Sequence, residues 1–130
     1  MPSSLLNVNF DCANPYRLAE FWCAVTGRTM DPDLNPDDDE TWVEMPSLPN
    51  LYFQRVPEPK VVKNRMHVCL VPDVPREAEL ERLVGLGASV VGDYRTADGR
   101  GWVVLGDPEG NEFCVLRSNA ERAAIGDQTV

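Results

Sequence analysis

Four side chains capable of acid–base or thiol chemistry fall into two short segments in the second half of the chain. His67, the only histidine, is followed two residues later by Cys69, and Glu112 is followed two residues later by Cys114. Residues two apart on a strand point to the same face. An imidazole beside a carboxylate could transfer protons, and an imidazole beside a thiolate could bind a metal ion or activate a nucleophile. The plainer alternatives are a hydrogen-bonded structural histidine and a buried, inert Cys114.

Further polar and aromatic side chains are expected on the strand faces that do not pack under a helix. Alternation assigns amide, aromatic and thiol groups to these faces: Asn7, Asn9, Trp42, Tyr52, Gln54, Cys69 and Trp102. This mixture is too polar for a dry core and too aromatic for a fully solvated surface, which is typical of a ligand-binding cleft. We therefore expect a small molecule to contact Asn9, Trp42, Tyr52, Cys69 and Trp102. The two tryptophans could instead fill the concave side of the sheet.

The elements that position these side chains occur twice, at an offset of 60 residues without a gap. The identical pairs include Val8 with Val68, Pro15 with Pro75, Gly27 with Gly87, Trp42 with Trp102, and Phe53 with Phe113. The same offset aligns Asn7 with His67 and Gln54 with Cys114. A pseudo-twofold relation between the copies would bring these four side chains around one centre.

The first copy is predicted to be a β-α-β-β-β module. Leu5 to Cys12 alternates as a half-buried strand, Asn14 and Pro15 begin a helix, and Gly27 ends it. The remaining predicted elements are strands at residues 42–45 and 51–56.

The second copy repeats the pattern. Met66, Val68 and Leu70 form the apolar side of a strand, and Pro75 opens a helix whose apolar face carries Leu80, Leu83 and Val84. The remaining predicted strands are residues 88–91, 102–105 and 112–116. The chain is therefore predicted to be one α+β domain, residues 1–130, with modules at 4–58 and 63–117 and a polar, frayed or lightly packed tail at 118–130.

Composition and charge exclude several classes of protein. The 12 Lys and Arg against 21 Asp and Glu give a net charge of −9, which argues against binding to nucleic acid or to an anionic membrane surface. No apolar run approaches the roughly 20 residues of a membrane span. The four cysteines form no C-x-x-C pair, so we expect free thiols in a cytoplasmic protein.

Several motifs carry a resemblance to a known family. The sequence resembles the vicinal oxygen chelate superfamily, which includes glyoxalases, extradiol dioxygenases, and fosfomycin- and bleomycin-resistance proteins, and within it the small bacterial glyoxalase-like domain proteins. The resemblance rests on Asn14-Pro15, Leu18-Ala19-Glu20-Phe21-Trp22, Gly27, Arg65-Met66-His67-Val68, Leu86-Gly87-Ala88 and Asp107-Pro108-Glu109-Gly110-Asn111-Glu112-Phe113. It implies paired βαβββ modules that form a curved mixed sheet around a cleft, and a homodimer.

The resemblance also implies where a metal ion would bind. The family's metal-ligand positions, typically His, Glu, His and Glu, correspond here to Asn7, Gln54, His67 and Cys114. Only His67 keeps the family's residue, which argues against metal binding and against the glyoxalase reaction. We therefore expect no cofactor, with a divalent metal as the alternative.

Three functions follow as hypotheses. The first is a glyoxalase-like protein that binds a small molecule in the cleft between its modules. The second is a lyase- or isomerase-type enzyme that uses His67, with Glu112 or Cys114, for acid–base or metal chemistry. The third is an antibiotic-sequestering resistance protein of the bleomycin-binding type, in which aromatic side chains such as Trp42 and Trp102 sandwich the drug.

Overall fold

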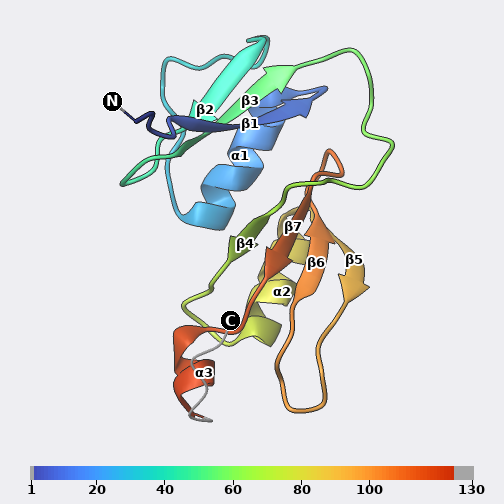
Figure 1. Ribbon diagram of the computed structural model, residues 1–130. Coiled ribbons are helices and arrows are strands. Elements are labelled where there is room, and N and C mark those ends of the chain that lie inside the picture. Colours follow the sequence, from blue (N-terminus) through green and yellow to red (C-terminus); the bar gives the residue numbers. More distant parts are fainter. Residues whose placement is uncertain (1, 125–130) are drawn as a thin grey trace. The chain divides into compact units, whose positions relative to one another are not determined.

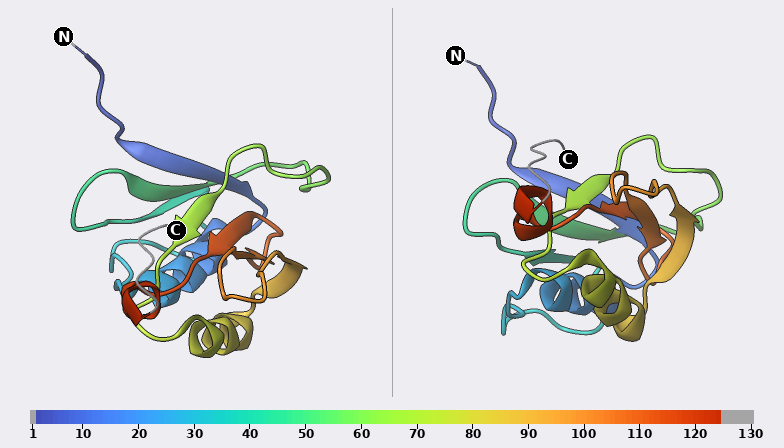
Figure 2. Two further views of the ribbon diagram at one scale, coloured as in Figure 1. Left: turned by 60° about the horizontal axis from the view of Figure 1, so that its bottom comes forward. Right: turned by 90° about the horizontal axis from the view of Figure 1, so that it is seen from below.

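The computed structural model describes residues 2–124 and divides the chain into two compact units, Met1–Val61 and Val62–Val130. Unit 1 contains β1 (Asn7–Cys12), α1 (Pro15–Thr26), β2 (Glu40–Val43) and β3 (Asn50–Arg55). Unit 2 contains β4 (Val68–Leu70), α2 (Arg76–Leu86), β5 (Ser89–Asp93), β6 (Val103–Gly106), β7 (Glu112–Val115) and α3 (Asn119–Ala124). Figures 1 and 2 show both units as α+β structures. No helix within residues 2–124 is both long enough and apolar enough to cross a membrane.

Unit 1 is a three-stranded sheet with one face covered by α1. The strand order is β1-β3-β2, with β1 parallel and β2 antiparallel to β3. The buried Thr41 hydroxyl on β2 donates to the carbonyl of Pro15, at 2.7 Å, and so joins the sheet to the start of the helix. The Phe10 ring lies 5.4 Å from Trp22 and 5.2 Å from Phe53, centroid to centroid. These rings form the core beneath α1.

Both ends of α1 follow the sequence signals. The Asn14 side chain accepts a hydrogen bond from the backbone N–H of Arg17, at 3.3 Å, which satisfies one of the unpaired donors of the first turn. Pro15 occupies the first helical position, and Gly27 ends the helix with a left-handed φ of 70°. The predicted start and end of this helix are confirmed.

Unit 2 is a four-stranded sheet in the order β4-β7-β6-β5. The short β4 pairs in parallel with β7, and the other neighbours are antiparallel. Leu83, Phe113 and Val115 are fully buried in its core. At the opposite edge from β4, the register of β5 shifts between Val90 and Gly92, so Val91 is an extra residue in a β-bulge.

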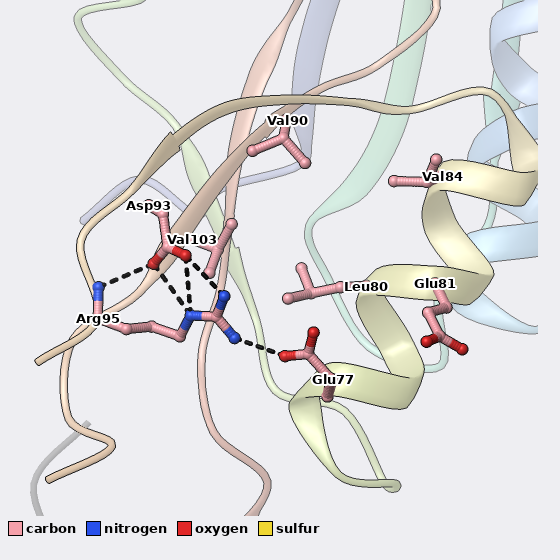
Figure 3. Close-up of a pocket in the computed structure, with 8 residues that line it drawn as sticks. All are labelled: Glu77, Leu80, Glu81, Val84, Val90, Asp93, Arg95 and Val103. Carbon is pink, nitrogen blue, oxygen red and sulfur yellow. Dashed lines mark hydrogen bonds and ion pairs between the residues drawn. The ribbon is translucent and has the colours of Figure 1, made fainter. Parts of the chain in front are cut away.

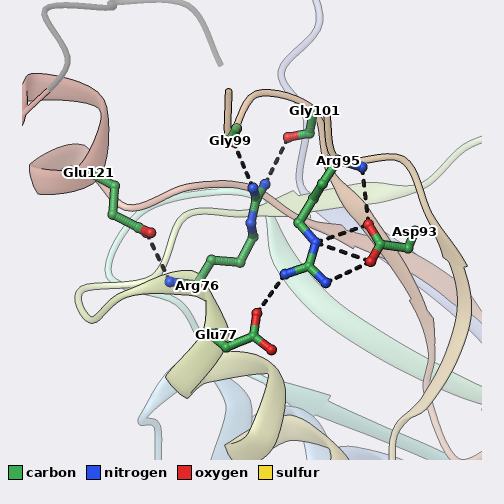
Figure 4. Close-up of polar contacts among 7 residues, drawn as sticks. All are labelled: Arg76, Glu77, Asp93, Arg95, Gly99, Gly101 and Glu121. Carbon is green, nitrogen blue, oxygen red and sulfur yellow. Dashed lines mark hydrogen bonds and ion pairs between the residues drawn. The ribbon is translucent and has the colours of Figure 1, made fainter. Parts of the chain in front are cut away.

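A buried arginine joins three segments of unit 2 (Figure 4). The Arg76 guanidinium donates to the carbonyls of Gly99 and Gly101, each at 2.8 Å, and its backbone N–H donates to Glu121 on α3, also at 2.8 Å. Burial lowers the pKa of Arg76. The start of α2 is thereby tied to the loop that precedes β6 and to α3.

Several sequence predictions for unit 2 were wrong in detail. Met66 is 85% exposed and precedes β4, so it does not extend the apolar side of that strand. Val84 is also exposed, because only Leu80 and Leu83 of the predicted helix face reach the core. In the tail that was predicted to be frayed or lightly packed, residues 119–124 form the short helix α3, which has no buried residue and is capped by reciprocal hydrogen bonds between Ser118 and Glu121. The rest of that tail, 125–130, lies outside the described residues.

The gapless repeat of 60 residues holds for the first strand but not for the later ones. Cys114 pairs with Cys69, whose counterpart at this offset is Asn9, and Asn9 pairs with Tyr52. Tyr52, and not Gln54, is therefore the ladder counterpart of Cys114. A matching of residue types cannot detect a change of loop length that moves a hairpin by two residues.

Candidate functional site

The face of the unit 1 sheet that points away from α1 carries a stacked aromatic pair between two carboxylates. The rings of Trp42 and Tyr52 lie 5.8 Å apart at an interplanar angle of 23°. The indole N–H of Trp42 donates to Oδ2 of Asp31, at 3.3 Å, and the Tyr52 hydroxyl donates to Oε2 of Glu40, at 3.1 Å. The Gln54 amide lies 3.5 Å from the other Glu40 oxygen. We call these five residues the acidic aromatic face.

Strand alternation and cross-strand pairing create this face. Thr41 and Val43 are buried under α1, which leaves Trp42 between them on the opposite side, where it is half-buried. Trp42 is the register partner of Tyr52 on β3, so the two rings stack across the strands. Burial, followed by the hydrogen bond to Glu40, raises the pKa of Tyr52.

The corresponding face of unit 2 gathers an imidazole and two thiols. Cys69 on β4 is the register partner of Cys114 on β7, and His67 lies two residues before Cys69. The Sγ atom of Cys114 is 3.9 Å from Nδ1 of His67, and the ligand atoms of all three residues lie within 4.8 Å of one another. Burial, and then the neighbouring Cys69, raise the pKa of the Cys114 thiol to about 11. A thiol with this pKa is protonated at neutral pH unless a bound cation stabilises the thiolate.

Glu112, which the sequence suggested as a catalytic base, is engaged in holding the segment before β4. Its carboxylate accepts from the backbone N–H of Asn64, at 2.8 Å, and pairs with Lys63 at 3.3 Å. In return, the Glu112 backbone N–H donates to the Asn64 side chain, at 3.1 Å. These contacts position the segment that leads to His67.

The family's metal-ligand set does not fit this chain. Within unit 1, Asn7 pairs with Asn50 whereas Gln54 pairs with Asp11. Asn7 and Gln54 are thus four residues apart along the ladder, or about 13 Å at roughly 3.3 Å per residue. Their amide groups do not converge, and neutral amides are weak donors for first-row divalent metals. Within unit 1 the ladder thus separates Asn7 from Gln54, whereas within unit 2 His67 and Cys114 lie close together.

Two other residues expected to contact ligand lie at exposed positions. Asn9 on β1 is exposed and is the register partner of Tyr52, next to the acidic aromatic face. Trp102 is 45% exposed and stacks on Tyr94, with centroids 5.6 Å apart and an interplanar angle of 28°. It precedes β6 instead of beginning it. Trp102 thus forms a second stacked pair that has no carboxylate hydrogen bond to its indole among the described contacts.

Unit 2 also has a hollow of about 510 Å³ between α2 and β5–β6 (Figure 3). Its walls are apolar at Leu80, Val84, Val90 and Val103. Three of its charged groups are paired with one another, since Arg95 contacts Asp93 at 2.6 Å and Glu77 at 2.5 Å. This hollow was not predicted from the sequence, because strand alternation points to ligand-binding side chains only on the sheet faces away from the helices. Its lining residues include no thiol and no imidazole.

Each unit has a mixed sheet with a helix between its first two strands in the chain, as in the α+β fold of the glyoxalase/bleomycin-resistance type. The model of the glyoxalase-like domain family matches residues 7–116. The chain therefore belongs to the glyoxalase-like domain family, within the vicinal oxygen chelate superfamily.

Solved structures share the fold at low sequence identity. A glyoxalase/bleomycin resistance protein/dioxygenase family enzyme from Burkholderia phytofirmans is 16% identical, with a TM-score of 0.66, over 87% of this chain and 97% of that one. The fosfomycin resistance protein FosX from Mesorhizobium loti is 15% identical, with a TM-score of 0.66, over 95% and 99%. TioX from Micromonospora sp. ML1 is 17% identical, with a TM-score of 0.55, over 88% and 98%. No curated protein sequence matches the chain significantly.

Proposed function

We propose that this chain binds a small organic molecule, and that the acidic aromatic face of unit 1 recognises a flat, positively charged part of it. The observation that carries the proposal is the stacked Trp42–Tyr52 pair flanked by Asp31 and Glu40. Aromatic faces attract cations by about 0.5–2 kcal/mol, more when the site is partly desolvated. The net charge of −9 favours the approach of a cation over that of an anion.

The role of the carboxylates is to orient the rings and to supply negative charge. Each carboxylate accepts from one ring of the stack, at 3.3 Å for the Trp42 indole and 3.1 Å for the Tyr52 hydroxyl. Holding both rings in one geometry before the ligand arrives lowers the entropic cost of binding. One structural neighbour is a fosfomycin resistance protein, which supports a small-molecule ligand without indicating which one. This proposal includes the hypothesis that the small molecule is an antibiotic, which the chain would sequester.

Calorimetric titration with two planar probes of opposite charge tests the proposal. Proflavine, an aromatic cation, should bind more tightly than fluorescein, an aromatic anion. Trp42→Leu should weaken proflavine binding by about tenfold, which corresponds to about 1.4 kcal/mol of cation–π and stacking energy. Glu40→Gln should weaken it less and reduce its dependence on salt.

The second stacked pair supplies a matched control. Trp102→Leu removes a ring of the same kind from the Tyr94–Trp102 pair of unit 2, and it should leave proflavine affinity unchanged. If fluorescein bound as tightly as proflavine, or if the two leucine variants lost affinity equally, the acidic aromatic face would not be the recognition surface.

A further inference from the structure

The cluster of His67, Cys69 and Cys114 lies entirely within unit 2 and does not use the acidic aromatic face. Cys69 and Cys114 are register partners on the parallel strands β4 and β7, so their side chains stand next to each other on one face. His67 precedes Cys69 by two residues, and its Nδ1 atom lies 3.9 Å from the Cys114 sulfur. The three ligand atoms all lie within 4.8 Å of one another.

We propose that these three side chains bind a thiophilic d10 metal ion such as Zn²⁺, in a site that differs from the family's four-residue arrangement. Zinc holds sulfur at about 2.3 Å and nitrogen at about 2.0 Å in a tetrahedron, which places its ligand atoms about 3.5–3.8 Å apart. The His67–Cys114 distance of 3.9 Å is already close to that value, and the other separations, which are all within 4.8 Å, must shorten by at most about an ångström. Rotation of the exposed Cys69 and His67 side chains can supply this movement.

The surroundings of the cluster suit an ion that enters from solvent. Cys114 is 2% exposed and forms the floor of the site, whereas His67 and Cys69 are exposed and form its open side. Val104, the register partner of Cys114 on β6, is 4% exposed and gives the sulfur an apolar neighbour. Two thiolates and a neutral imidazole would balance the charge of a divalent ion, and the nearby Glu112 is already paired with Lys63.

The chemistry of the donors decides between this site and the family's site. Thiolate and imidazole select zinc and similar soft ions, whereas the neutral amides of Asn7 and Gln54 are weak donors for first-row divalent metals. The proposed site takes Cys69, which is not a family ligand position, and omits Asn7 and Gln54. With three protein ligands, a tetrahedral ion keeps one position open to water or to a small ligand.

The test uses the full chain, purified without a histidine tag, reduced and treated with a chelator. Co²⁺ is titrated as a spectroscopic substitute for Zn²⁺, and thiolate-to-cobalt charge-transfer absorption reports sulfur ligation directly. Zn²⁺ should then displace Co²⁺, and competition with a chromogenic chelator gives the zinc affinity. We expect saturation at about one ion per chain, as a single tetrahedral site requires.

Variants of each ligand and matched controls assign the site. Cys69→Ser, Cys114→Ser and His67→Gln should each weaken Co²⁺ binding by more than the roughly 10–100-fold that outer-shell changes cost. Cys23→Ser, which alters a buried thiol in unit 1, should leave binding unchanged, as should Gln54→Ala. Because Cys114 is buried and its variant could misfold, the exposed Cys69 supplies the decisive variant, with circular dichroism to verify folding.

Three results would overturn the proposal. The first is the absence of thiolate-to-cobalt absorption at millimolar Co²⁺. The second is binding by a folded Cys69→Ser variant that equals binding by the unaltered chain. The third is loss of Co²⁺ binding in Asn7→Ala or Gln54→Ala, which would show that the ion binds at the family's four ligand positions. None of these results bears on proflavine binding by unit 1, so this proposal and the proposed function can fail separately.

Discussion

Glu112 offers a direct test of how unit 2 positions its polar face. Glu112→Ala removes the acceptor of the Asn64 N–H, which lies 2.8 Å from the carboxylate of a residue only 8% exposed. A hydrogen bond to a charged group contributes about 1.5–3 kcal/mol. The ion pair with Lys63 adds at most about 1 kcal/mol, because 63% of the lysine side chain is exposed. We therefore expect Glu112→Ala to lower the free energy of unfolding by about 2–4 kcal/mol.

Glu112→Gln is the matched variant, because it keeps an oxygen that can accept from Asn64 and loses only the charge. It should cost about 1 kcal/mol. Urea unfolding followed by circular dichroism measures the difference. With a denaturant slope of about 2 kcal/mol per molar, the midpoint should fall by about 1–2 M for Glu112→Ala and by about 0.5 M for Glu112→Gln.

Equal midpoints for the two variants would refute this reasoning, since the hydrogen bond to Asn64 would then contribute nothing. The pair also separates two roles of Glu112. Both variants remove the carboxylate, so the function of a general base would be lost equally in both. A positioning function should be largely retained by glutamine and lost with alanine.

Three further predictions concern the stability of each unit. Hydrogen bonds from Arg95 lower the pKa of Asp93 from 3.8 to about 2. Their stabilising contribution is therefore complete above pH 3.8 and is lost as the pH falls through about 2. An NMR titration of the Asp93 carboxyl carbon should show a midpoint near 2, and a midpoint near 3.8 would contradict this prediction. Phe53→Ala, at a residue with 0% exposure, should cost about 3–5 kcal/mol in urea unfolding, against a smaller loss for Phe53→Leu. Asn14→Ala should cost about 1 kcal/mol through loss of the α1 cap, whereas Asn14→Asp should retain it.

Local signals in the sequence were sufficient to predict the ends of α1 and the strand faces of unit 1. The amide of Asn14 and the left-handed Gly27 act on the turns next to them, so their effect on α1 can be read from neighbouring residues. Alternation likewise separated Trp42 and Tyr52 from the side chains under α1, because strand periodicity is independent of the partner strand.

Cross-strand register could not be predicted in the same way. The approach of Cys69 to Cys114 depends on which residues of β4 and β7 lie opposite each other, and these strands are more than 40 residues apart in the chain. A shift of two residues preserves every side-chain face, so the hydrophobic pattern cannot distinguish the alternatives. For this reason the sequence pointed to Gln54 as the counterpart of Cys114, while the ladder gives Tyr52.

The bulge at Val91 has a consequence for how this protein behaves at high concentration. β5 is an edge strand that exposes Val90 and Val91, and a regular apolar edge would present an unbroken row of N–H and C=O groups to another chain. The extra residue interrupts that row and increases the local twist, so an incoming strand would lose its register after a few residues. The β-bulge at Val91 thus opposes edge-to-edge aggregation through the exposed apolar strand β5.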